Sequence, residues 1–183
     1  MEKQTVLIVG GTGLIGQNLK LHFQKLKYNV RILSRNKKSE CHWNPSENEF
    51  DHSILKGVDY IINLCGMQID KKWTKKRKEK IYSSRVLSTR LLISSINSSS
   101  VKIKKYIGVS AIGFYKYSEK LQQESSKKGH HFLADICNKW EKETIQIQKV
   151  PYSILRLGVV LSKKGGMLNR LMWPFSLNLG CSL

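Results

Sequence analysis

The chain has 183 residues, of which 40% are hydrophobic and 25% charged, a composition typical of a soluble globular protein with a sizeable core. Its formal net charge of +19 raises nucleic acid as a partner. Most of the 32 basic residues are lysine, however, and the densest run, at 71–78, is typical of a solvated helix face. A compositional drift toward lysine explains this charge, and we expect a small-molecule substrate rather than nucleic acid.

Several other classes of protein are excluded by pattern. No apolar run reaches the ~18 residues of a membrane-spanning helix, and the short apolar stretch near the N-terminus is no signal peptide. Cys41, Cys65, Cys137 and Cys181 form no CxxC pair and no zinc-ligand spacing. Isolated cysteines of this kind are typical of reduced thiols, so we expect a cytoplasmic protein without a metal site.

A glycine-rich turn follows the first apolar run. The β-branched run at 5–9 predicts a buried strand, and Gly10, Gly13 and Gly16 follow it before a helical pattern begins. Such glycines permit a tight turn, close approach of the backbone to a pyrophosphate, and close packing of helix on strand. The pattern therefore predicts a dinucleotide site, although a simple strand–turn–helix also uses glycines. The cofactor-binding residues predicted here are Gly10, Thr12, Gly13, Leu14, Ile15 and Gly16.

The second strand ends in a serine and an arginine. A predicted helix at 14–27 and a strand at 28–33 complete a βαβ unit with the first strand. Ser34 and Arg35 then occupy the place where an NAD-specific site has an acidic residue bonded to the ribose 2′-hydroxyl. Serine and arginine instead suit a 2′-phosphate, which predicts NADP as the cofactor. The alternative is a solvated arginine at the end of a strand.

The rest of the chain goes on alternating between strands and helices. We predict strands at 59–66, 105–110 and 150–161, helices at 74–95 and 132–148, and a short extra strand within the polar loop 36–52. This alternation predicts one α/β domain over residues 1–183 with a doubly wound parallel sheet. On the helix at 74–95, Arg85 is either a snorkelling side chain or a ligand group.

Eight motifs in the same order match a known family. They are GGTGLIG (10–16), LSR (33–35), WNP (43–45), NLCG (63–66), SRVLSTRLL (84–92), SAIGFY (110–115), FLADICNKWE (132–141) and RLGVVLSKKGGML (156–168). With them the chain resembles the atypical extended short-chain dehydrogenases/reductases, in the epimerase or sugar-nucleotide-epimerase-like branch of the NAD(P)-dependent epimerase/dehydratase superfamily. The resemblance implies a Rossmann fold that binds NADP.

The resemblance also implies roles for particular residues. Ser34 and Arg35 would hold the 2′-phosphate, and Leu64 and Cys65, next to Gly66, would line the ribose. In the same way, Arg85 would reach the cofactor and Val160 would lie near the nicotinamide.

The chain departs from many relatives at the proton-transfer pair. They carry Tyr-x-x-x-Lys, in which the lysine lowers the pKa of the tyrosine for acid–base work. This chain has no tyrosine with a lysine four residues later, and Leu133 and Cys137 stand where the pair would fall. Ser110 and Tyr115 are the remaining candidates for a catalytic role, although each is equally compatible with a structural role at the end of a strand.

A second departure is length. Family members continue into a small substrate-binding domain, most of which this chain lacks, so we expect the apolar segment 167–175 to lie exposed and to promote self-association. The expected function is that of an NADP(H)-binding oxidoreductase or epimerase with an unknown substrate. The alternative is a non-catalytic NADP-binding sensor or regulatory protein, or a truncated inactive enzyme.

Overall fold

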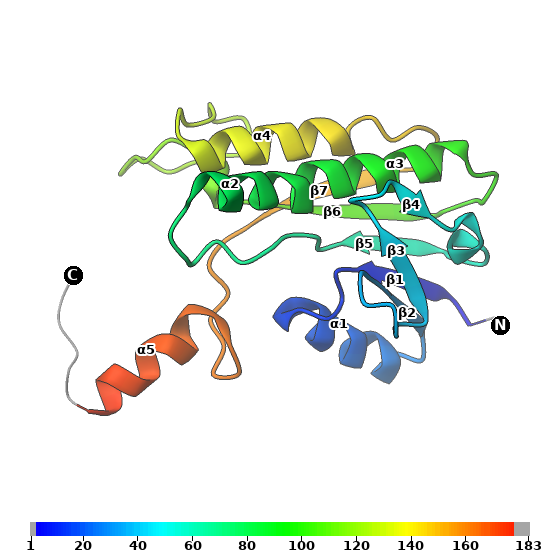
Figure 1. Cartoon of the computed structure of the whole chain (residues 1–183), viewed down its shortest axis with the longest axis horizontal. Helices are drawn as coiled ribbons and strands as arrows, with labels where there is room; N and C mark the ends of the chain where they lie inside the picture. The colour runs from blue at the N-terminus through cyan, green and yellow to red at the C-terminus, as the bar shows by residue number, and fades with distance from the viewer. Residues whose placement is uncertain (1–2, 178–183) are drawn as a thin grey trace.

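A seven-stranded sheet occupies the centre of the molecule (Figure 1). The structure is a computed structural model and describes residues 3–177. The strands lie in the order β4-β3-β2-β1-β5-β6-β7, and all neighbours are parallel except β3 and β4. They are β1 (Thr5–Val9), β2 (Asn29–Ser34), β3 (Cys41–Asn44), β4 (Glu49–Phe50), β5 (Tyr60–Asn63), β6 (Lys105–Ala111) and β7 (Tyr152–Leu157). The predicted doubly wound parallel sheet is confirmed, and an antiparallel edge strand is added to it.

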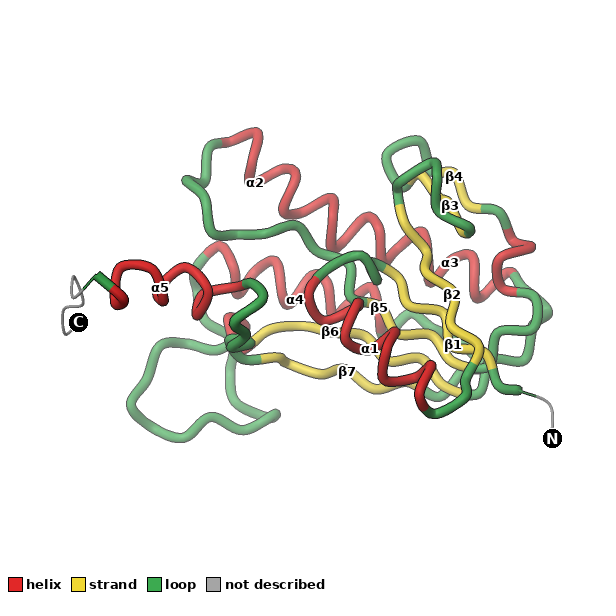
Figure 2. The backbone as a smooth tube through the Cα atoms, turned by 90° about the horizontal axis from the view of Figure 1, so that it is seen from below, coloured by secondary structure: helices red, strands yellow, loops and turns green. Residues whose placement is uncertain are grey.

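Helices cover the two faces of the sheet unequally (Figures 1 and 2). One face carries α1, and the other carries α2, α3 and α4. A fifth helix, α5, follows the last strand. The helices are α1 (Leu14–Lys25), α2 (Lys75–Tyr82), α3 (Ser88–Ser98), α4 (Phe132–Thr144) and α5 (Gly166–Ser176), with short 3₁₀ turns at His52–Leu55 and Ile112–Phe114.

One predicted helix is interrupted. The span 74–95 was expected to be a regular helix, but a π-helical turn at Ser83–Leu87 separates α2 from α3. The predicted strand at 150–161 is also shorter in the structure, because β7 ends at Leu157. The π-helical turn contributes Ser84 to the pocket described below, and the end of β7 lies at a second groove.

The core forms two layers, one on each side of the sheet. Side chains alternate along β1, so that Val6 and Ile8 pack with Leu19 and Phe23 on the α1 side, whereas Leu7 and Val9 join the larger cluster under α3. Every residue of β1 is buried, as expected for a central parallel strand with helices on both faces.

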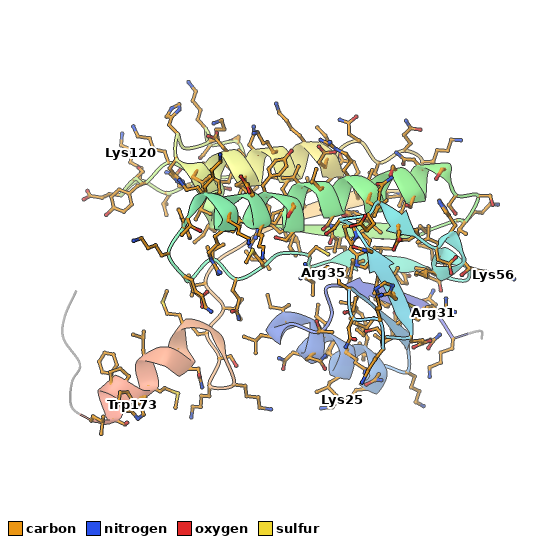
Figure 3. All side chains as sticks on the ribbon, viewed as in Figure 1. Lys25, Arg31, Arg35, Lys56, Lys120 and Trp173 are labelled. Carbon is orange, nitrogen blue, oxygen red and sulfur yellow. The ribbon has the colours of Figure 1, made fainter. Side chains whose placement is uncertain are left out.

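Helix α5 lies apart from this core. In both views it projects beyond the end of the sheet (Figures 1 and 2), and Trp173 is labelled on it in Figure 3. Its large apolar side chains are exposed, including Met167, Leu171, Trp173 (69% exposed) and Phe175. The expected apolar surface is therefore present. Among residues 3–177 no helix is both long and apolar enough to cross a membrane.

Candidate functional site

A pocket of about 460 Å³ opens at the carboxyl ends of β1, β2 and β5. The chain proceeds from β1 toward β2 and β3 in one direction, and from β5 toward β6 and β7 in the other. The pocket therefore lies at the switch point of the sheet, where open α/β proteins bind their ligands. The predicted residues that line it are Gly10, Thr12, Gly13, Ser34, Arg35, Leu64, Cys65 and Gly66.

Packing within the protein requires glycine at two positions of the glycine turn, Gly10 and Gly16. Gly10 has φ +74°, and a Cβ there would lie 3.1 Å from the carbonyl oxygen of Leu64. A Cβ at Gly16 would lie 2.4 Å from the Cα of Gly11. At Gly13, in contrast, φ is −77° and the nearest atom to a Cβ would be 3.7 Å away. Internal packing therefore does not require glycine at position 13, where the absence of a Cβ leaves the backbone open to the pocket.

The N-terminus of α1 presents unsatisfied donors at this pocket. Gly13 is the N-cap, no described side chain caps the helix, and its first turn carries no acidic residue. The first N–H groups of a helix lack intrahelical acceptors and favour an anion at this position. The turn is therefore suited to a phosphate group, as the glycine spacing predicts.

Arg35 stands out among the arginines. Six arginine side chains are described, and five of them, at positions 31, 77, 85, 90 and 156, bond to a carbonyl or a carboxylate. The guanidinium of Arg35, labelled in Figure 3, has no such partner among residues 3–177, and it lines the pocket. Next to it Ser34 is buried, and its Oγ accepts a hydrogen bond from the N–H of Asn36 at 3.1 Å.

The end of β5 is held by a buried polar network. Asn63 Nδ2 donates to Thr89 Oγ1 and to Tyr106 Oη, both at 2.9 Å, and Trp140 Nε1 donates to the same Thr89 oxygen at 2.9 Å. Asn63 Oδ1 accepts from the N–H of Cys65 at 3.1 Å, which fixes the backbone that lines the pocket. Burial raises the pKa of the Cys65 thiol to about 12, so this group stays protonated and is no nucleophile at neutral pH.

Arg85 lies behind the pocket rather than in its wall. Its Nη2 donates to the carbonyl of Met67 at 3.0 Å, and the guanidinium carbon lies 5.5 Å from the centre of the Trp140 ring. Nη1 is buried and has no partner among the described residues. A Cβ at Gly66 would lie 3.0 Å from the guanidinium, and burial lowers the pKa of Arg85. The side chain therefore does not snorkel into solvent, and its predicted contact with the cofactor stays a prediction.

Ser110 and Tyr115 occupy different environments at the end of β6. Ser110 is buried, its Oγ has no standard hydrogen bond among the described residues, and it faces the thiol of Cys137. The Tyr115 hydroxyl accepts from Arg156 Nη1 at 3.0 Å, and Arg156 is paired through two bonds with Glu141. Neither candidate lines the 460 Å³ pocket.

The remaining predicted residues lie at a second groove of about 570 Å³. Leu14, Ile15 and Val160 line it, between α1 and the segment after β7. The structure therefore separates these three from the pocket that holds Gly13 and Arg35.

Five pocket residues were missed by reasoning from sequence alone, namely Leu33, Asn36, Trp43, Ser84 and Ser88. Trp43 and the two serines lie in motifs noted above, WNP and SRVLSTRLL, but no local pattern shows which way their side chains point.

Comparison with known proteins gives a consistent result. Residues 6–163 match the model of the NAD-dependent epimerase/dehydratase family. An epimerase family protein of Mycobacterium bovis is 35% identical over 190 residues, which cover 100% of this chain and 62% of that protein. The human epimerase family protein SDR39U1 (isoform 2), solved with NADPH, aligns with a TM-score of 0.83 and 26% identity over 97% of this chain and 61% of its own. The nucleoside-diphosphate sugar epimerase of Corynebacterium glutamicum aligns with a TM-score of 0.80 and 32% identity over 96% and 38%.

The relatives are longer proteins. The chain spans about 62% of the mycobacterial relative and 61% of the human one, and in both cases almost all of this chain is aligned. Family match, identity and fold agree with the motifs found in the sequence. The chain belongs to the NAD-dependent epimerase/dehydratase family.

Proposed function

We propose that the 460 Å³ pocket binds NADP(H) and that the chain is the cofactor-binding part of an oxidoreductase or epimerase. The unpaired guanidinium of Arg35, at the end of β2, is the observation that carries the proposal. A cationic side chain at this position favours a ribose 2′-phosphate over a free 2′-hydroxyl. The human relative solved with NADPH supports the choice of cofactor.

Each part of the pocket suits one part of such a cofactor. The N–H groups at the start of α1 would hold the pyrophosphate, with Gly13 leaving room for it. Arg35 and Ser34 would bind the 2′-phosphate, and Leu64 and Cys65 would line the ribose. When bound, the cofactor supplies hydride transfer at its nicotinamide ring.

Proton transfer would fall to Ser110 or Tyr115. Ser110 is favoured because its buried hydroxyl has no oxygen or nitrogen partner among the described residues and faces only the weakly hydrogen-bonding thiol of Cys137, so that it would donate to a substrate oxygen. The Tyr115 hydroxyl already accepts from Arg156, which gives it a structural task. We propose a small-molecule substrate and a cytoplasmic location for the active protein, and no role in binding nucleic acid.

The second candidate function is a non-catalytic NADP-binding sensor. One observation favours it: Arg35 and Cys65 are the only ionisable side chains that line the described pocket, and the Cys65 thiol has a pKa of about 12. Neither group is a general acid or base near neutral pH. Oxidation of NADPH across a panel of sugar nucleotides and small carbonyl compounds separates the two functions, because a sensor would show none.

Calorimetry of the purified chain with NADPH and NADH tests the proposal. A charge-assisted contact from Arg35 contributes roughly 1.5–3 kcal/mol, so NADPH should bind about ten to a hundred times more tightly than NADH. Arg35→Asp should abolish or reverse this preference. Lys37→Asp, the same change of charge two residues away on an exposed side chain outside the pocket, is the control. Equal affinity of the unmodified protein for the two dinucleotides would contradict the assignment.

A further inference from the structure

A small chamber of about 70 Å³ adjoins the 460 Å³ pocket. Arg35, Ser84 and Ser88 line both spaces, so the chamber continues the pocket past the guanidinium of Arg35. Its other polar side chains are Ser46, which follows β3, and Ser83, in the π-helical turn. We call this space the serine chamber. A volume of this size corresponds to about two water molecules and suits one small group rather than a ring system.

The hydroxyl groups of the serine chamber are weakly engaged. Ser83 Oγ donates to the carbonyl of Lys80 at 3.3 Å, and Ser88 Oγ donates to the carbonyl of Ser83 at 3.2 Å. Both bonds are longer than the ~2.7–2.8 Å typical of O–H···O bonds. The Ser46 hydroxyl has no hydrogen bond to any residue that the structure describes. These protons are available to a stronger acceptor.

Ser84 has a different task. Its Oγ accepts from the N–H of Met67 and donates to the carbonyl of Ile81, both at 3.1 Å. It therefore ties the π-helical turn to the segment after β5. Ser84 is a positioning residue, and we leave it out of the ligand set.

The positive charge of Arg35 favours an anionic ligand in the serine chamber. The guanidinium of Arg35 has no described partner, and no carboxylate lines the serine chamber. A cation beside several hydroxyl donors matches the oxygens of a phosphoryl group, which accept charge-assisted hydrogen bonds. Arg35 is exposed, so a neutral ligand would leave its guanidinium to water, whereas a phosphoryl group would pair with its charge.

We propose that the serine chamber receives the 2′-phosphate of NADP(H), with Ser46 and Ser88 as donors in addition to Arg35. The inference rests on the proposed function and extends it to two further specificity-determining residues. In this arrangement the hydroxyls of Ser46 and Ser88 turn from the protein to the phosphate. Discrimination between NADP and NAD then depends on the π-helical turn and the loop after β3 as well as on the end of β2.

The test measures the binding of 2′,5′-ADP and 5′-ADP to the full chain by calorimetry. Both probes contain adenosine. The first, 2′,5′-ADP, carries one phosphate at the 5′ and one at the 2′ position, whereas 5′-ADP carries a diphosphate at the 5′ position and a free 2′-hydroxyl. Ser88→Ala and Ser46→Ala should each weaken binding of 2′,5′-ADP about tenfold, the effect of one lost bond to a charged group, and leave 5′-ADP unchanged. Ser46→Asp, which puts a carboxylate on an exposed position at the chamber, should reduce binding of 2′,5′-ADP by more than a hundredfold, again with no change for 5′-ADP. Ser94→Ala is the matched control, because Ser94 Oγ also bonds a helix carbonyl, that of Leu91 at 2.9 Å, and lies outside both spaces.

The outcomes separate this inference from the proposed function. If the unmodified chain prefers NADPH but the Ser46 and Ser88 variants bind 2′,5′-ADP normally, the serine chamber is not the phosphate site and the proposed function stands. Equal weakening of both probes would place the adenine there instead and overturn the inference. A chain that binds neither 2′,5′-ADP nor NADPH would overturn the inference and the proposed function together.

Discussion

Strand β1 is buried along its whole length, whereas no residue of strand β7 is fully buried. Arg156 in β7 bonds to Glu141 on α4, so its neighbours Leu155 and Leu157 point to the opposite face by the alternation of a strand. There Leu155 is 47% exposed, and the groove beside Leu157 is open. Described residues thus enclose the 460 Å³ pocket, whereas Val160 and the large apolar side chains of α5 are exposed. Under the proposed function, variants in the pocket should therefore change cofactor binding without changing the exposed surface around α5, and the reverse should also hold.

The largest effects are expected in the glycine turn, which belongs to the buried region around β1. Gly13→Val should abolish NADPH binding, a loss of more than about a hundredfold, while the protein stays folded, because a Cβ at position 13 meets no atom closer than 3.7 Å. Gly16→Val should instead prevent folding, since a Cβ at position 16 would lie 2.4 Å from Gly11 Cα. Calorimetry and thermal unfolding of both variants measure the two effects. Full NADPH affinity in folded Gly13→Val would mean that the turn is only structural.

The exposed apolar segment 167–175 should control self-association of the chain. We propose that the apolar surface at 167–175 joins copies of the chain, since burial of each such side chain contributes roughly 1.5–3 kcal/mol. Changing Leu171, Met172 and Trp173 together to glutamine should therefore turn dimers or larger assemblies into monomers in light scattering, with unchanged NADPH affinity. The control replaces Leu21 and Leu26, which are also exposed but lie on or next to α1. An unmodified chain that is already monomeric would refute the proposal.

Alkaline pH tests the burial of the Cys65 thiol through the free energy of unfolding. Burial raises the pKa of Cys65 from 9.0 to about 12, so above pH 9 the unfolded chain releases a proton that the folded protein keeps. The contribution of the thiol to stability is complete below pH 9 and is lost as the pH rises from 9 toward 12. Between pH 8 and pH 10.5 the free energy of unfolding should fall by about 2 kcal/mol more in the unmodified protein than in Cys65→Ala. Denaturant unfolding at the two pH values measures the difference, and parallel changes would show that the thiol is accessible to water.

The smallest effect is expected at Tyr115. Tyr115→Phe removes one acceptor from Arg156, which keeps Glu141 and the carbonyl of Glu124, so the stability should fall by only about 1 kcal/mol. NADPH affinity should not change, because Tyr115 lies outside the pocket. A tenfold loss of affinity in this variant would move Tyr115 into the cofactor site.

The sequence predicted best what local pattern determines. The βαβ unit and the residues of the glycine turn were found because strand, glycine spacing and helix follow one another within 30 residues. Of the long-range parts of the site, Leu64, Cys65 and Gly66 were found through the family motif, whereas the serines after α2 were not. Ser84, in the π-helical turn, and Ser88, at the start of α3, reach the pocket from some 50 residues beyond Arg35. The pairing of Arg156 with Glu141 depends on how α4 packs on β7. Side-chain direction at such distances is set by tertiary packing, which periodicity does not report.

The π-helical turn constrains the number of residues in the segment 83–87. Successive residues of an α-helix are rotated by about 100°, and a π turn accommodates one residue beyond the regular repeat. Helix α2 carries a solvated lysine-rich sequence, whereas seven of the eleven residues of α3 are buried. The π-helical turn between them sets how far the side chains of α2 are rotated about the helix axis relative to those of α3. Deleting a single residue within 83–87 would rotate the lysines of α2 toward the sheet or carry Ser84 away from Arg35. The length of this segment is therefore under the same constraint as the identity of its side chains.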